Sequence, residues 1–456
     1  MGNKSQRVLD WLNRRKPFRS LTRQELAWVL YDVGNSAFTM LSCSLIPIWF
    51  SNLLVSGGVM DQTRATGTWG AIQAVVTVFV AILGPICGAI TDHKDTRKII
   101  FQTTVAAGVV CCIINGFVTN WILFMIVYML SRFFYQASLT FYDSMLNDVT
   151  TEQRADQVSS YGYAWGYIGS CIPFIIALIA YVLGPAMVGI LSDAVSKLIG
   201  FTFTGLWWIF ATLPLLKNYK QRNYVEGKIR IGSTLRENGA TLKRIVTQDK
   251  KVLFFLIAFF LYIDGVGTII DNCVTLGKAL DLNDIGLIIF LLGSQVVAWI
   301  SSVIFAKLTA RFKTVSLLLV CICGYTVVSI YALFIRNLWD FAIMAFIVGC
   351  FQGSIQSLSR SYYAKIIPAE KSGEYFGIYD IFAKGASFLG SGIIALLMFL
   401  GDDNGKITFR FFSGSLRVGC VNLAMFALGV FFVLGFLFLK LSDSQKHILP
   451  EKESVQ

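Results

Sequence analysis

Residues 25–52 read ELAWVLYDVGNSAFTMLSCSLIPIWFSN, a long apolar run with a carboxylate, Asp32, inside it. A hydrocarbon core of about 30 Å needs about 20 apolar residues in a helix, so this run is long enough to cross a membrane. Eleven further runs of similar character follow, at 67–91, 99–118, 121–145, 158–183, 198–216, 252–272, 284–306, 314–335, 339–362, 375–400 and 418–440. The pattern predicts an all-α membrane protein with twelve transmembrane helices.

The composition agrees with a protein that lies largely within a bilayer. Hydrophobic residues make up 55 % of the chain and charged residues 14 %, against about 25 % charged residues in an average soluble domain. Residues 1–24 are basic and polar, without the apolar stretch and cleavage site of a signal peptide. We therefore expect the first span to act as the insertion signal.

The lysines and arginines are distributed unequally between the two sides of the predicted membrane. If the N-terminus is cytoplasmic, thirty of the 39 fall in cytoplasmic segments and seven in outside loops. Cytoplasmic loops of membrane proteins carry such an excess, so both termini are expected in the cytoplasm. The net charge of +12 is then a topology signal, and we do not expect a nucleic-acid partner.

The cysteines and histidines do not indicate a metal site or a cofactor. The ten cysteines lack zinc-binding spacing and lie mostly within the spans, where they are expected to be packing residues. The two histidines, His93 and His447, lie outside the spans. Any proton carried through the membrane must therefore be carried by carboxylates.

The longest polar connection divides the spans into two sets of six. It covers residues 217–251, between an N-terminal six-helix bundle at 25–216 and a C-terminal six-helix bundle at 252–440. A basic cytoplasmic arm at 1–24 and a cytoplasmic tail at 441–456 complete the predicted organisation. This division into six and six is the layout of the major facilitator superfamily, and we expect that fold.

An internal repeat supports the two halves. Thr151–Tyr161 matches Ala369–Tyr379 at a constant offset of 218 residues, and Leu30–Asp32 in the first span resembles Leu261–Asp264 in the seventh. Transporters are commonly built from repeats of this size, with a binding site near the midplane where the halves meet. The two bundles are therefore expected to be pseudo-symmetric.

The loop after the second span reads GAITDHKDTRK, from Gly88 to Lys98, and resembles the cytoplasmic signature of this superfamily. Gly88 permits close helix approach, Asp92 can accept from the N-terminus of a neighbouring helix, and Arg97 supplies a partner charge. We predict that these residues form a gate that closes the cytoplasmic side. The alternative is that the charges of this short loop only set the topology.

Charged side chains within the spans need a partner or a watery cavity, because each costs about 2.5–3.5 kcal/mol at the bilayer centre. Helical spacing places most of them on one-sided polar stripes. The stripes comprise Asp32 and Asn35 in the first span, Arg132 and Gln136 in the fourth, Asp264 in the seventh, and Gln352, Gln356 and Arg360 in the tenth. These four spans line the central cavity in the superfamily's fold.

We interpret these stripes as a binding site for a zwitterion. Arg132 is expected to meet a carboxylate of the solute, and Asp32 and Asp264 an ammonium group. Either aspartate could also carry a proton, since burial favours the neutral form. Helix capping or interhelical hydrogen bonding by the Asp32 stripe is the alternative.

A second set of charges lies towards the cytoplasmic side. Arg360 ends its stripe there, and Asp380 and Lys384 are four residues apart in the eleventh span, as in an ion pair. We assign these residues to the gate. Simple mutual neutralisation of Asp380 and Lys384 is the alternative.

Four stretches in both halves are distinctive, and they are Trp28–Phe38 (WVLYDVGNSAF), Leu146–Gly169 (LNDVTTEQRADQVSSYGYAWGYIG), Phe259–Gly267 (FFLYIDGVG) and Gln352–Lys384 (QGSIQSLSRSYYAKIIPAEKSGEYFGIYDIFAK). They resemble the Atg-type vacuolar effluxer family of the major facilitator superfamily, in particular its bacterial branch. The resemblance implies a twelve-helix transporter, and its fungal members are associated with export of amino acids from the vacuole. Asp143 departs from the family pattern, because similar sequences tend to have asparagine there, and we assign it to the gate.

The sequence thus predicts a secondary active transporter for a small polar or zwitterionic solute, with an amino-acid-like substrate favoured and proton-coupled export by alternating access. Export of amphipathic drugs or lipid-like molecules is one alternative, and a non-transporting membrane receptor or assembly partner is another. An enzyme is not expected, and no nucleotide-binding loop is present. The expected partners are a small-molecule substrate, the lipid bilayer and protons, with the chain a monomer in a bacterial cytoplasmic membrane.

Overall fold

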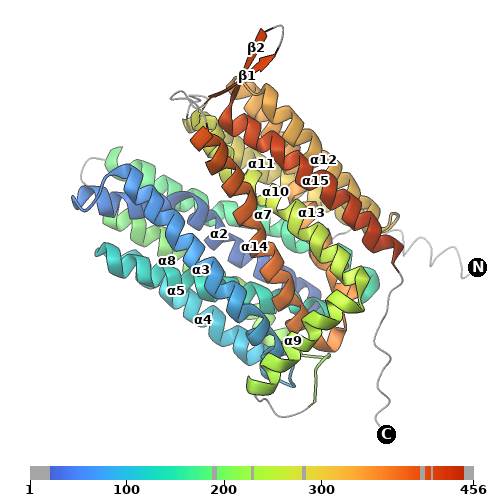
Figure 1. The fold of residues 1–456 in the computed structure, drawn as a ribbon. Helices are drawn as coiled ribbons and strands as arrows, with labels where there is room; N and C mark the ends of the chain where they lie inside the picture. The colour runs from blue at the N-terminus through green and yellow to red at the C-terminus, as the bar shows by residue number, and fades with distance from the viewer. Residues whose placement is uncertain are drawn as a thin grey trace, which may run out of the picture.

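The computed structural model describes residues 21–186, 193–226, 231–279, 284–400, 406–411 and 414–445. The described chain is almost entirely helical, and the helices form two bundles joined by a connection that contains α9, Ile231–Thr247 (Figure 1). His447 and the terminal parts of the predicted arm and tail lie outside the described residues.

The first bundle contains six long helices and one short one. They are α2 (Arg23–Ser56), α3 (Gln62–Thr91), α4 (Thr96–Phe117), α5 (Trp121–Ser144), α6 (Leu146–Val149), α7 (Glu152–Ala186) and α8 (Asp193–Asn218). Each of the first six predicted spans lies on one of the long helices.

The second bundle again contains six long helices. They are α10 (Lys250–Ala279), α11 (Asp284–Leu308), α12 (Thr314–Tyr331), α13 (Leu338–Ile366), α14 (Ser372–Leu400) and α15 (Cys420–Ser444), with short 3-10 turns η1 (Ala332–Phe334) and η2 (Ala369–Lys371). Eleven helices of the described chain are long and apolar enough to cross a membrane. The long helix outside that set is α14, so the count of twelve spans stays a prediction.

One element was not expected from the sequence. Strands β1 (Lys406–Phe411) and β2 (Gly414–Gly419) form an antiparallel hairpin between α14 and α15, with Lys406 opposite Gly419 and Phe411 opposite Gly414. The hairpin lies at one end of the molecule and α9 at the other (Figure 1). We call these the hairpin end and the α9 end.

Local sequence explains where several helices begin. Thr22 accepts from the backbone N–H of Glu25, and the Glu25 side chain accepts from the N–H of Thr22, which is a capping box at the start of α2. Asn337 and Asp340 form the same arrangement at the start of α13. These caps satisfy N–H groups that the first turn of a helix leaves without partners.

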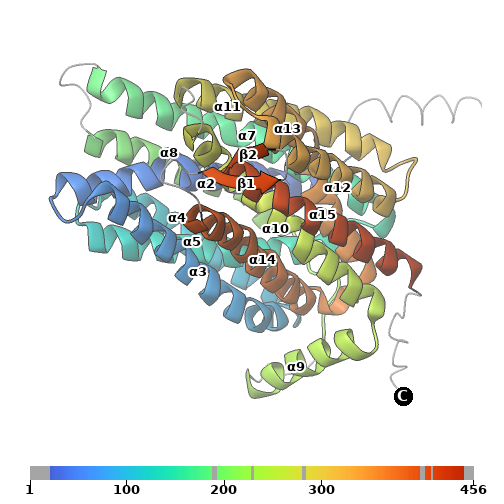
Figure 2. The ribbon, with the colours of Figure 1, turned by 45° about the horizontal axis from the view of Figure 1, so that its top comes forward.

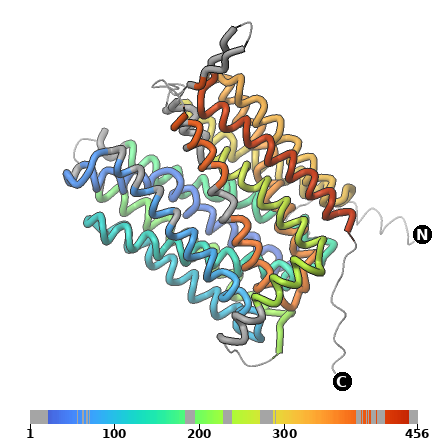
Figure 3. Tube along the Cα trace, in the orientation of Figure 1, coloured from blue at the N-terminus to red at the C-terminus, as the bar shows by residue number. Residues whose placement is uncertain are grey.

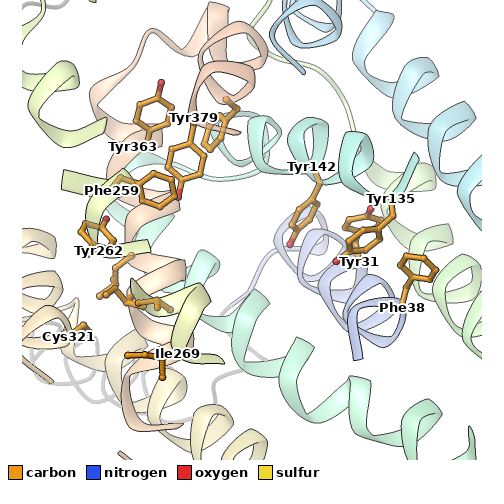
Figure 4. Close-up of a cluster of buried hydrophobic side chains, with 14 of the residues drawn as sticks. Tyr31, Phe38, Tyr135, Tyr142, Phe259, Tyr262, Ile269, Cys321, Tyr363 and Tyr379 are labelled. Carbon is orange, nitrogen blue, oxygen red and sulfur yellow. The ribbon is translucent and has the colours of Figure 1, made fainter. Parts of the chain in front are cut away.

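Buried tyrosines hold equivalent helices together in the two bundles. In the first bundle Tyr31 of α2 is hydrogen-bonded to Ser138 of α5 at 2.7 Å, and in the second Tyr262 of α10 is bonded to Ser359 of α13 at 2.6 Å. Figure 4 shows these two tyrosines within separate groups of buried side chains. Tyr31 and Tyr262 are matched positions of the predicted repeat, and each makes the same kind of contact in its own bundle.

The two bundles lie closer together at the α9 end than at the hairpin end (Figures 1 and 3). Between the bundles, α3 packs against α14, and α7 packs against α11 and α13. Figure 2 shows α3 beside α14 from a second direction. The polar contacts that connect the bundles near the α9 end form the candidate site.

Candidate functional site

Arg360 of α13 is inserted between two carboxylates of the other bundle. Its Nη2 donates to Asp32 Oδ2 of α2 at 3.2 Å, and its Nη1 donates to Asp143 Oδ1 of α5 at 2.9 Å. The arginine is 2 % exposed and Asp32 is 6 % exposed. Charge-assisted hydrogen bonds of this kind are among the stronger polar contacts in proteins, so this cluster joins the two bundles.

Aromatic rings and a serine complete the surroundings of the guanidinium. Its central carbon lies 4.5 Å from the ring centre of Trp28 and 4.5 Å from that of Tyr163. Ser159 accepts from Nε through its hydroxyl at 2.9 Å and from Nη2 through its carbonyl at 3.1 Å. Rings within about 6 Å of a cation attract it, and all three guanidinium nitrogens are bonded.

Gly162 is required by this packing. A Cβ at this position would lie 2.4 Å from Asp32 Oδ2 and 3.1 Å from Arg360 Nη2. Any larger residue at position 162 would displace the ion pair.

A second ion pair connects the bundles nearer the α9 end. Lys365 Nζ of α13 donates to both carboxylate oxygens of Asp156, on α7, at 2.8 Å. Ser361 and Thr314 of the second bundle also donate to Asp156, at 2.7 Å and 2.6 Å. The side chains of the pair are 17 % and 12 % exposed, so this contact is reached by water.

The third contact is a helix end of one bundle capped by the other. Asp92 Oδ1 accepts from the N–H of Gly373 at 2.7 Å, and Oδ2 accepts from the N–H of Glu374 at 2.8 Å, in the first turn of α14. A carboxylate at this position satisfies otherwise unbonded N–H groups and complements the helix dipole. The sequence predicted that Asp92 accepts from a neighbouring helix, and the structure shows this contact.

Two glycines allow the cap to form. A Cβ on Gly88 would lie 2.1 Å from the carbonyl oxygen of Gly373, and a Cβ on Gly373 would lie 2.3 Å from the carbonyl oxygen of Gly88. Backbone therefore meets backbone between α3 and α14. The close helix approach predicted for Gly88 is present, and its partner is Gly373.

Arg97 links the cap to a deeper anchor within the first bundle. Its Nη2 donates to Asp92 Oδ1 at 2.5 Å and its Nη1 to Asp148 Oδ2 at 2.8 Å, with the arginine side chain fully buried. Burial raises the pKa of the Asp92 carboxyl, and Arg97 and the N–H groups of α14 lower it, so that the resulting pKa is about 7. The ionised form of Asp92 therefore depends on its contacts with Arg97 and α14.

Asp148 also holds the connection that leads to the second bundle. Its carboxylate accepts from the Tyr219 hydroxyl at 2.5 Å and from the backbone N–H groups of Arg222 and Asn223 at 3.1 Å and 2.9 Å. Burial raises the pKa of the Tyr219 phenol well above its usual range, so the phenol stays protonated and donates. Asp148 and Arg97 thus link the start of the connection between the bundles to the Asp92 cap of α14.

The structure joins residues that the sequence analysis assigned to different roles. Asp32 was placed in the substrate site and Arg360 and Asp143 in the gate, but all three form one ion cluster. Asn35 Nδ2 donates to Asp32 Oδ1 at 3.4 Å and so belongs with them.

The other predicted substrate residues lie elsewhere in the two bundles. Arg132 lies with its guanidinium carbon 5.3 Å from the ring centre of Tyr135, on its own helix. Gln136 and Gln356 are half-buried and Gln352 is buried. The contacts that the structure shows for the first stripe join Asp32 to Arg360 and to Asn35.

Asp264 is buried in the second bundle against α14. Its Oδ1 accepts from the N–H of Gly390 at 3.2 Å. Within the described part of the chain, its Oδ2 is buried without a hydrogen-bond partner. This carboxyl is therefore set apart from the Arg360 cluster.

Asp380 connects α14 to the first bundle through a hydrogen bond from the Thr140 hydroxyl. The predicted partner of Asp380 was Lys384, whose side chain lies outside the described residues. The Asp380–Lys384 pair stays a prediction.

Sequence reasoning missed several members of these contacts. Trp28 is one helical turn before Asp32, and Ser159 and Tyr163 lie one turn apart on α7. Residues spaced in this way share a face of a helix, so their spacing could have indicated that they belong to one site. The pair of Asp156 and Lys365 had no signal of this kind, because its members are 209 residues apart.

Comparison with known proteins identifies the family. The family model described as "Vacuole effluxer Atg22 like" matches residues 69–446. The "Uncharacterized MFS-type transporter YxiO" of Bacillus subtilis (strain 168) is 36 % identical over 425 residues, which are 92 % of this chain and 95 % of that protein. Autophagy-related protein 22 of Coccidioides immitis (strain RS) is 27 % identical over 281 residues, 55 % of this chain and 45 % of the fungal protein. The alignment thus spans less than half of the fungal relative.

Solved structures show the same fold at low sequence identity. FucP, a major facilitator superfamily transporter in the outward conformation, has a TM-score of 0.67 and 12 % identity over 92 % of this chain and 98 % of its own. A bacterial homologue of the iron transporter ferroportin in the outward-facing state has a TM-score of 0.66 and 14 % identity over 93 % and 99 %. Proteins of this superfamily are generally not enzymes. The chain belongs to the Atg22-like vacuole effluxer family and is a multi-pass membrane transporter of the major facilitator superfamily.

Proposed function

We propose that this transporter exports a small polar or zwitterionic solute, with an amino acid favoured, by alternating access coupled to a proton gradient. The family description names an effluxer, which supports export. The amino-acid-like solute follows from the resemblance to the fungal members of the family. We further propose that the α9 end and both termini are cytoplasmic, as the lysine and arginine distribution predicts.

The main observation that supports this proposal is the cluster of Arg360, Asp32 and Asp143 between the bundles. The three contacts described near the α9 end, Arg360 with Asp32 and Asp143, Lys365 with Asp156, and Asp92 with α14, are polar and join residues of opposite bundles. When polar contacts of this kind break, water or a solute can take the place of the lost partner. They therefore suit an interface that must open and close in each transport cycle.

We assign two roles to the predicted residues. Gly88, Asp92, Arg97, Asp143, Arg360 and the pair Asp380 and Lys384 act as the gate that is closed at the α9 end. Asn35, Arg132, Gln136, Gln352 and Gln356, with Asp32 and Asp264, line the path of the solute.

Proton coupling is assigned to Asp32 and Asp264. Ionising a buried carboxyl without a counter-charge is costly in a membrane interior, and Asp264 has one oxygen with no hydrogen-bond partner in the described structure. Asp32 changes its surroundings when Arg360 leaves it. Each group thus has a reason to bind a proton in one state and release it in another.

The test is transport by the purified chain in proteoliposomes with an imposed pH gradient. Labelled amino acids are the first solutes, with a lipophilic dye for the drug-export alternative. We expect amino-acid flux that follows the gradient in the wild type, and flux without pH dependence in Asp32→Asn/Asp264→Asn. The control is Asp443→Asn, which changes an exposed aspartate at the end of α15.

Each alternative has its own outcome. Dye flux without amino-acid flux would favour export of amphipathic molecules. Unchanged pH dependence in the double variant would exclude proton coupling at these two aspartates. Absence of flux for every solute class in folded protein would favour the receptor or assembly role.

A further inference from the structure

We propose that the site now filled by Arg360 is the binding site for the cationic group of the transported solute, a guanidinium or a primary ammonium. We call this site the cation cage and define it by Trp28, Asp32, Asp143, Ser159 and Tyr163. The inference rests on the proposed transport function and adds the chemical class of the substrate.

All members of the cation cage belong to one bundle, and its occupant belongs to the other. Trp28 and Asp32 lie on α2, Asp143 lies on α5, and the other two lie on α7, whereas Arg360 lies on α13. When the bundles separate at the α9 end, Arg360 leaves with the second bundle. The cage then remains as a preformed site in the first bundle.

The two carboxylates of the cage, Asp32 and Asp143, need another cation when Arg360 leaves. In the closed arrangement two carboxylates contact one guanidinium, at 2.9 Å and 3.2 Å. On opening, both carboxylates lose this partner while they stay within a membrane protein, where unpaired charge is unfavourable. A solute that brings its own cation restores the lost pairing.

The geometry of the cage fits a flat, delocalised cation. Two aromatic rings lie 4.5 Å from the guanidinium carbon, one from Trp28 and one from Tyr163. Acceptors at Asp32, Asp143 and Ser159 meet all three of its nitrogens. Aromatic faces and carboxylates together are the groups that recognise organic cations.

Competition between Arg360 and the solute would couple closure to release. Arg360 returns to the cage each time the α9 end closes, and a bound cation must then leave the cage in the direction of the hairpin end. The arginine is thus a tethered competitor of the solute. The apparent affinity for the solute therefore depends on the fraction of molecules whose α9 end is open.

The first experiment empties the cage and refills it with a small probe. Full-length Arg360→Ala in lipid nanodiscs is heated with millimolar methylguanidinium chloride or with the same concentration of sodium chloride. A ligand that binds the folded state raises the unfolding temperature, so we expect methylguanidinium to give a larger shift than sodium. The shift should be lost in Arg360→Ala/Asp143→Asn and retained in Arg360→Ala/Asp156→Asn, whose second change removes an inter-bundle carboxylate outside the cage.

The second experiment leaves the cage and Arg360 intact. Gly88→Ala forces α3 from α14 and should open the α9 end, whereas Gly84→Ala adds a Cβ that lies 3.7 Å from its nearest neighbour. Binding of agmatine, which carries a guanidinium and an ammonium, is measured for both variants. We expect Gly88→Ala to bind agmatine more tightly than Gly84→Ala, by the factor by which its open fraction is larger. If Arg360→Ala does not fold, this second experiment by itself tests whether the cation cage binds a cation.

Other results would overturn the inference. Equal shifts from methylguanidinium and sodium, or equal agmatine binding in the two glycine variants despite different open fractions, exclude the cage as a cation site. Stabilisation of Arg360→Ala by acidification but not by methylguanidinium means that the carboxylates take protons instead. Transport of a polar solute that has no cationic group, without agmatine binding, overturns this inference and leaves the proposed function standing. Agmatine binding without transport of any solute overturns the proposed function and leaves the cage.

Discussion

Gly88→Ala is expected to drive the protein away from the arrangement that is closed at the α9 end. The added Cβ would lie 2.1 Å from the carbonyl oxygen of Gly373 and 2.8 Å from its carbonyl carbon. Both atoms are backbone, so no side-chain rotation can relieve the contact. Ordinary contact begins at 3.4 Å, which leaves a shortfall of about 1.3 Å that α3 and α14 must make up by moving apart.

The energetic effect falls on the closed arrangement alone. Overpacking at a tight contact typically costs about 1–3 kcal/mol, and the cost disappears once the two helices separate. A free-energy change of about 1–3 kcal/mol corresponds to a change of about 5- to 150-fold in an equilibrium. The ratio of closed to open molecules at the α9 end should therefore fall by that factor.

The change can be read as a distance between the bundles. Spin labels at Lys94 and Glu370, two exposed positions on opposite sides of the contact, report the separation in purified protein. Gly84→Ala is the matched control, because its Cβ would meet the Gly377 carbonyl oxygen at an ordinary 3.7 Å on the same pair of helices. Both substitutions also gain helix propensity, by about 1 kcal/mol, so that effect cancels in the comparison.

The expected result is a longer or broader distance distribution for Gly88→Ala than for Gly84→Ala and the wild type. The same distribution in all three proteins, each folded and monodisperse, would refute the reasoning. It would mean that α3 and α14 absorb the methyl group without opening the interface.

Three further substitutions test other ion pairs of the structure. Asp148→Asn removes a partner of a fully buried arginine, so we expect the free energy of unfolding to fall by about 3–5 kcal/mol, seen as a lower unfolding temperature than in the exposed control Asp95→Asn. Glu25→Gln keeps the capping box at the start of α2 but loses the ion pair of Glu25 with Arg154 of α7, at 2.8 Å. A smaller loss in the free energy of unfolding, about 1.5 kcal/mol, is expected for a charged hydrogen bond, and a loss as large as that of Asp148→Asn would contradict this ranking. Lys365→Met breaks an ion pair between the bundles and should raise the open fraction in the same distance measurement, whereas Lys371→Met, which changes a pair within one bundle, should not.

The sequence by itself determined where the long helices lie. Whether a segment enters a membrane depends on its own length and polarity, which are local properties. Each predicted span accordingly overlaps one long helix, and the matched positions Tyr31 and Tyr262 each bond a serine in their own bundle. The close approach at Gly88 and the acceptor role of Asp92 were also predictable, because a short loop brings these residues to a helix end.

Only the tertiary structure decided which charges meet. Arg360 and Asp32 are 328 residues apart, and their contact depends on the rotation of each helix about its axis and on how the two bundles dock. The stripes placed Asp32 and Arg360 on suitable faces but could not say that the two would pair, nor that Arg132 would lie against Tyr135. A polar stripe records that a helix face is polar, whereas an ion pair requires two such faces to meet at the same depth, and that depth is set by packing between the bundles.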